Sequence, residues 1–117
     1  MPRFDIRYDD TTVRDLLKAN ASTLTAEIAT IMSTDDPKGE VLPKYVKLEL
    51  TFAPDDVNVR SVSVNVSARA IPGRIGEERV IARRLRAAFV AATEGRYSVG
   101  VWVALSAHSA YREYMPE

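Results

Sequence analysis

The feature that most constrains the fold of this chain is a pattern that occurs twice: an alternating strand, an amphipathic helix and a second alternating strand. Residues 2–8 alternate, and so do residues 45–52, so each stretch is typical of a half-buried strand. Between them, apolar residues recur at steps of three or four, which predicts one continuous amphipathic helix. The residues of this apolar stripe are Val13, Leu17, Ala21, Leu24, Ile28 and Met32.

The second copy of the pattern starts about 60 residues after the first, close to half the chain length. Residues 62–70 place valines and alanines on one side and mostly polar residues on the other, which predicts a strand. A second helix is expected from about Gly76 to Thr93, and a last strand over 98–105 with Trp102 on the side opposite the valines.

This order predicts an α+β, two-layer fold: two β-α-β units forming a four-stranded sheet with two helices on one face. The 117 residues fit a single domain over 1–117, with 1–53 and 57–105 as the two units and 106–117 as a tail without a clear period. The other sheet face stays open, which predicts oligomerisation. A ferredoxin-like dimer has its elements in the same order and is an alternative.

Composition narrows the classes of function. Lys plus Arg and Asp plus Glu number 16 each, so the net charge is zero and we expect no nucleic-acid partner. We interpret Arg79, Arg83 and Arg86 as a solvated face of the second helix, near Glu78. The absence of cysteine excludes disulfides and cysteine-zinc sites, and no metal-binding spacing is present. Apolar runs are too short to span a membrane, and the N-terminus has no signal-peptide pattern, so we expect no membrane partner and a cytoplasmic location.

The start MPRFDI, the two β-α-β units and the segment ARAIPGRIGEER together resemble the tautomerase superfamily, and most of all 5-carboxymethyl-2-hydroxymuconate isomerase. The resemblance implies that Met1 is removed, that Pro2 becomes the catalytic base, and that homotrimers form with active sites between subunits. It places Arg74, of the Gly73-Arg74 pair, at an arginine that contacts substrate. Lys44 lies near a second arginine position of that family, and Trp102 near an aromatic residue supplied by a neighbouring subunit.

The chemistry of these residues agrees with such a role. A free α-amino group has a pKa near ~7.7–8, and both burial in an apolar pocket and nearby cations lower this pKa. A free N-terminal nitrogen on Pro2, buried in such a pocket, would therefore be a base near neutral pH. Arg74 can hold a carboxylate with two hydrogen bonds, and Arg69 on the polar face of its strand is a further candidate. Phe4 and Trp102 are candidates for the apolar wall.

We therefore predict a tautomerase or isomerase without cofactor that acts on a small enol, 2-keto or 2-hydroxymuconate-like acid. The main alternative is a non-catalytic oligomeric binding module on the same fold. It is motivated by Lys44 in place of an arginine and by the unassigned tail.

Overall fold

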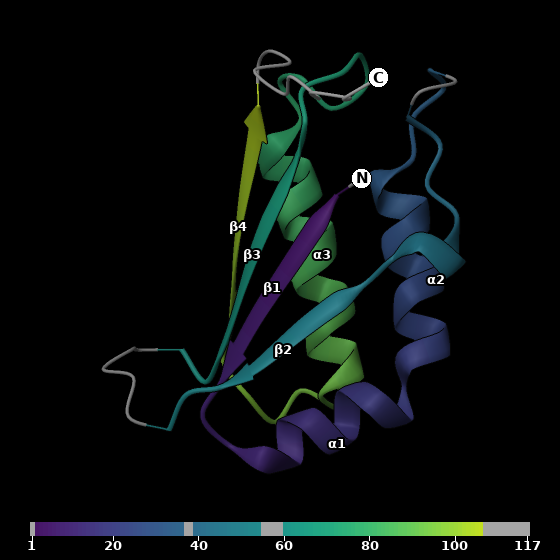
Figure 1. Ribbon diagram of the computed structural model, residues 1–117. Coiled ribbons are helices and arrows are strands. Elements are labelled where there is room, and N and C mark those ends of the chain that lie inside the picture. Colours follow the sequence, from purple (N-terminus) through teal and green to yellow (C-terminus); the bar gives the residue numbers. More distant parts are fainter. Residues whose placement is uncertain (1, 37–38, 55–59, 107–117) are drawn as a thin grey trace, which may run out of the picture.

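A computed structural model describes residues 2–36, 39–54 and 60–106, and these form two layers, a four-stranded sheet and a layer of helices (Figure 1). The sheet has the order β2-β1-β3-β4. In chain order the elements are β1 (Arg3–Tyr8), α1 (Thr11–Ala19), α2 (Ala21–Met32), the 3-10 helix η2 (Pro43–Tyr45), β2 (Leu48–Phe52), β3 (Val62–Arg69), α3 (Glu78–Ala92) and β4 (Val99–Ser106).

The strand pairing confirms the duplicated β-α-β layout. β1 pairs with β2 in parallel, β3 pairs with β4 in parallel, and the two units meet where β1 pairs with β3 antiparallel. No other strand lies between the two parallel strands of either unit. In the ferredoxin-like arrangement the β-α-β units are split, so the strand order excludes that alternative.

The alternating pattern of each strand directs one row of side chains to the helices. Ile6 lies between Leu50 and Val64 in the register, and Val101 follows on β4, so these apolar residues form a row across the sheet. They pack against the apolar stripes of α2 and α3, which cover this face (Figure 1). The opposite face carries the row Glu49, Asp5, Asn65 and Trp102 and has no helix over it.

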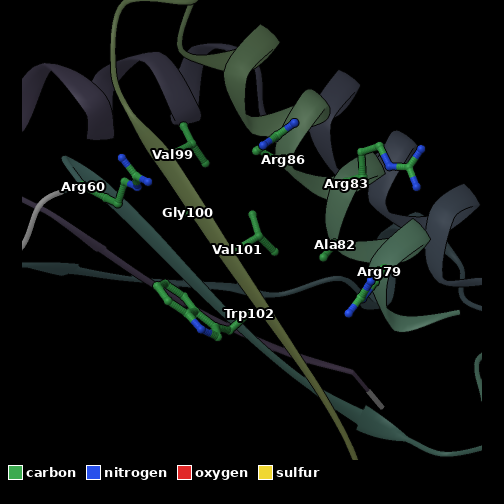
Figure 2. A pocket seen from close by; sticks show the side chains of 9 residues that line it. All are labelled: Arg60, Arg79, Ala82, Arg83, Arg86, Val99, Gly100, Val101 and Trp102. Carbon is green, nitrogen blue, oxygen red and sulfur yellow. The ribbon is translucent and has the colours of Figure 1, made fainter. Parts of the chain in front are cut away.

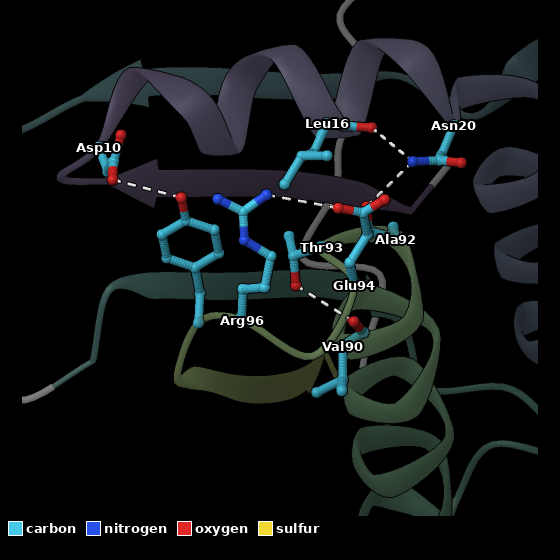
Figure 3. Close-up of polar contacts among 9 residues, drawn as sticks. Asp10, Leu16, Asn20, Val90, Ala92, Thr93, Glu94 and Arg96 are labelled. Carbon is cyan, nitrogen blue, oxygen red and sulfur yellow. Dashed lines mark hydrogen bonds and ion pairs between the residues drawn. The ribbon is translucent and has the colours of Figure 1, made fainter.

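The prediction of a single helix over 13–32 is wrong, because the helix breaks at Asn20. The backbone of Asn20 leaves the helical region, with φ −105° and ψ 16°. Its side-chain amide donates to the carbonyl of Leu16 at 2.9 Å and to that of Ala92, at the end of α3, at 3.1 Å (Figure 3). A short amide side chain that bonds nearby carbonyls competes with the helical pattern, so α1 and α2 run in different directions. Among the described residues, three α-helices therefore take the place of the two expected.

Hydrogen bonds around α1 fix the lower end of the molecule as drawn. Asp10 caps α1 by accepting from the backbone N–H of Thr12 at 2.9 Å, and it also accepts from the Tyr97 hydroxyl at 3.3 Å (Figure 3). The backbone bond from Thr12 is the main reason that the pKa of Asp10 lies below its usual value.

Two further expectations differ from the structure. The second strand begins at Leu48 rather than Tyr45, because Pro43–Tyr45 forms a 3-10 turn in which the Val46 N–H bonds the carbonyl of Pro43 at 3.1 Å. The predicted tail 106–117 lies outside the described residues except for Ser106, which ends β4.

Within the described ranges, no helix combines the length and apolar character needed to cross a membrane.

Candidate functional site

Pro2 lies immediately before β1, at the end of the central strand pair. It is half-buried. In the register Arg3 is opposite Ser67 near the end of β3, and Phe4 is opposite Leu48 at the start of β2. The first residues of β1, the last of β3 and the segment leading into β2 therefore meet at one end of the sheet. The candidates Lys44, Arg69 and Arg74 belong to segments at this end of the sheet.

Arg74 is buried, with 4% of its surface exposed. Its guanidinium donates from Nε and Nη2 to the carbonyl of Met32 at 3.1 and 3.0 Å, and from Nη1 to the carbonyl of Arg69 at 3.3 Å. Because Met32 is the last residue of α2, the arginine satisfies a helix-end carbonyl and complements the helix dipole. Burial, and then the charge of Arg69, lower the pKa of Arg74 from its usual value. The side chain thus ties α2 to the end of β3.

Near the contact of Arg74 with Met32, the loop after α2 packs closely against the loop that carries Gly73 and Arg74. A Cβ atom on Gly73, whose φ is +93°, would lie 2.8 Å from Thr34 Cβ, and one on Gly39 would meet the same threonine and Ile71. Ser33 binds the chain on the other side of this loop, since its hydroxyl accepts from the Val41 N–H at 2.9 Å. The loop after α2, which leads to Lys44, is therefore packed directly on the loop that carries Arg74.

Lys44 and Arg69 are exposed cations at the same end of the sheet as Pro2. Lys44 lies in η2, with its Nζ 5.1 Å from the centre of the Tyr45 ring. Arg69 is the last residue of β3. Glu49, on the same face of the sheet, forms an ion pair with Arg3 at 3.4 Å. The side chains of Lys44 and Arg69 are therefore both exposed, on segments that lie at this end of the sheet.

The two aromatic candidates lie in different surroundings. Phe4 is fully buried in the core between the sheet and the helices. Trp102 is 59% exposed on the open face, where it stands in the same row as Asp5 and Asn65. Within one subunit Trp102 is therefore two strands and three register positions away from Pro2. A contact between Trp102 and a substrate at Pro2 stays a prediction that requires a neighbouring subunit.

Sequence reasoning did not foresee a cavity of about 450 Å³ along the outer edge of β4 (Figure 2). Arginines from α3 lie on one side of the strand, and Arg60 and Trp102 on the other (Figure 2). Within the described part of the chain Glu78 forms no ion pair with these arginines, and its carboxylate accepts from the Gly76 N–H at 3.3 Å. The feature of the sequence that could have indicated this cavity is the spacing of the arginines on α3 around the small residue Ala82. The lining residues are Arg60, Arg79, Ala82, Arg83, Arg86, Val99, Gly100, Val101 and Trp102.

In the described part of the chain there is no cluster of three or more His, Cys, Asp or Glu side chains that could hold a metal ion. Cationic side chains are instead the prominent polar groups, both near Pro2 and along β4. Such groups are suited to carboxylate or phosphate ligands.

Comparison with known proteins supports the fold. No family model matches the sequence, and no curated protein matches it. Among solved structures, 5-carboxymethyl-2-hydroxymuconate delta-isomerase aligns with a TM-score of 0.59 and 15% identity, over 100% of this chain and 89% of the other. Native Ps01740 aligns with a TM-score of 0.52 and 14% identity, over 94% of this chain and 98% of the other. The chain therefore shares its α+β, tautomerase-like fold with these two structures, as its two β-α-β units predicted.

Proposed function

We propose that the protein is a tautomerase or isomerase without cofactor, in which Pro2, freed by removal of Met1, acts as the general base. The observation that carries the proposal is the place of Pro2 in this fold. It precedes the central strand β1, half-buried, at the end of the sheet where Lys44 and Arg69 are exposed. The likeness in fold to an isomerase supports the same reaction class.

The reaction moves one proton within the substrate. The neutral nitrogen of Pro2 takes a proton from a carbon or hydroxyl group conjugated with a carbonyl, and the resulting cation returns it at another position of the conjugated system. Lys44 and Arg69 would hold the substrate carboxylate and favour the neutral form of the amine. The substrate class is a small enol, 2-keto or 2-hydroxymuconate-like acid.

The proposal assigns secondary roles to three further residues, Arg74, Phe4 and Trp102. Arg74 would reach substrate only with the N–H groups that Met32 and Arg69 do not use. Phe4 would shape the site from the core side, beneath the start of β1. Trp102 would come from a neighbouring subunit of a homotrimer, which would also cover the open sheet face. These three assignments are tested after that of Pro2.

The direct test is the ketonisation of phenylenolpyruvate by the wild type and by Pro2→Ala. We expect kcat/KM to fall about a hundred- to ten-thousand-fold in the variant, the usual contribution of a positioned general base. A second variant that retains a residue before Pro2 converts the amine to an amide and should lose the same activity. Equal rates for the wild type and both variants would remove the proposal.

The second candidate is a non-catalytic oligomeric binding module. It is favoured by one observation: the buried guanidinium of Arg74 is directed to backbone carbonyls. The intact mass of the purified protein separates the two candidates. A mass that includes Met1 favours the module, because the nitrogen of Pro2 would then be an amide without basicity.

A further inference from the structure

We propose that the cavity along the outer edge of β4 is a second binding site, for a small polyanion that carries at least two phosphate or carboxylate groups. The cavity measures about 450 Å³, within the range of small-molecule sites, roughly 300–1,000 Å³. Within one subunit the cavity is separate from Pro2, and the inference does not depend on the proposed reaction.

The first argument is the row of arginines on α3. Arg79, Arg83 and Arg86 follow one another at steps of four and three residues, so their side chains share one face of the helix. The row spans about 10 Å at a rise of about 1.5 Å per residue. In Figure 2 the row lies beside β4, on the opposite side of the strand from Arg60 and Trp102. Several anionic groups of one molecule can therefore each meet a separate arginine.

The second argument is the charge balance at this place. Within residues 2–36, 39–54 and 60–106, no carboxylate forms an ion pair with Arg79, Arg83 or Arg86. The whole chain has a net charge of zero, so this excess of positive charge is local. Like charges at such spacing destabilise a helix, and a bound anion would remove this repulsion. Guanidinium groups bind carboxylate and phosphate in a planar, two-bonded geometry.

The third argument is the opposite wall of the cavity. A Cβ atom on Gly100 would lie 3.2 Å from Arg60 Cγ and 3.3 Å from the ring of Trp102, so both side chains pack over this glycine. The absence of a side chain at Gly100 lets them approach the edge of β4. Trp102 adds a flat apolar surface beside the charges. A uniformly solvated helix face would not have this second wall.

The register separates this site from Pro2. Trp102 stands opposite Asn65, which stands opposite Asp5, three residues after Pro2 on β1. With about 3.3 Å per residue along a strand and about 4.8 Å between strands, the two places are about 10 Å apart in each direction within one subunit.

The test is a titration of the full-length protein at low salt with tripolyphosphate and, separately, with citrate. Binding is followed by calorimetry and by the fluorescence of Trp102, the only tryptophan of the chain. We expect saturable binding that weakens as salt rises. Arg83→Gln should weaken it about tenfold, the loss of one hydrogen-bonded charge contact. Arg84→Gln is the matched control. Arg84 is next to Arg83 in the sequence, and its side chain is exposed and does not line the cavity.

The outcomes separate the possibilities. Tighter binding of tripolyphosphate indicates a phosphate ligand and tighter binding of citrate a carboxylate ligand, and both support the site. No saturable binding of either probe, or equal effects of Arg83→Gln and Arg84→Gln, would overturn it. Loss of binding in Pro2→Ala would overturn its separation from the proposed active site. A single-stranded oligonucleotide that binds more tightly than tripolyphosphate through Arg83 would overturn the small-molecule assignment.

Discussion

At the scale of the residue, Arg74 shows how a charged side chain can hold two elements together from inside. Its N–H groups meet the carbonyls of Met32 and Arg69, and the side chain has almost no exposure to solvent. A shorter or apolar side chain would leave these carbonyls without a partner in a place that water reaches poorly. Such a loss costs more than the net gain from an ordinary hydrogen bond.

We predict that Arg74→Ala lowers the free energy of unfolding by roughly 2–3 kcal/mol, because it leaves buried carbonyls unpaired and removes packing. Urea unfolding of the wild type and the variant measures the change. Arg84→Ala is the control, since Arg84 is exposed on α3 and its loss should change stability by less than about 0.5 kcal/mol. If both variants unfold at the same urea concentration, Arg74 does not stabilise the fold in this way.

Some residue properties were predictable from the sequence and others were not. The Gly73-Arg74 pair and the place of Pro2 before a strand follow from local patterns. The direction of the Arg74 side chain does not, because its main partner, Met32, lies 42 residues away. The same holds for Arg60, which reaches the edge of β4 only through the pairing of β3 with β4.

At the scale of the element, the break at Asn20 decides how the helices cover the sheet. The periodic apolar pattern runs through residue 20 without interruption, so periodicity alone predicts one helix. The signal for the break is the contact of the Asn20 amide with Ala92 on α3, which is tertiary. Tertiary contacts commonly override local propensity in this way. The strands, by contrast, were predictable, because the alternation of apolar and polar residues that indicates a strand is a local pattern of a few residues.

Asn20→Asp tests this account with almost no change in shape. The carboxylate would place acceptors where the amide now donates to the carbonyls of Leu16 and Ala92. We expect a loss of roughly 1–3 kcal/mol in the free energy of unfolding at neutral pH. The measurement is urea unfolding followed by circular dichroism. Thr23→Asp, on an exposed position of α2, is the control for added charge on the same helix. A variant Asn20→Asp as stable as this control would contradict the proposed role of the amide.

At the scale of the whole molecule, the fold leaves one face of the sheet without cover. The central row of that face contains Asp5, Asn65 and Trp102, and the edge strands β2 and β4 have no partner on their outer sides within the described sheet. Exposed sheet faces and edges are usually protected by association. The proposed site at Pro2 also needs a second wall, which one subunit does not supply through Trp102.

We therefore predict that the protein is a trimer in solution, with a mass of about three times the 13.0 kDa of the chain. Light scattering measures the mass directly. If the trimer covers the open face, Asn65→Glu should weaken it, because the new carboxylate would stand beside Asp5 in a buried interface. Ala87→Glu, on the exposed side of α3, should leave the mass unchanged. A monomeric or dimeric wild type would contradict the prediction, and it would leave Trp102 without a route to a neighbouring Pro2.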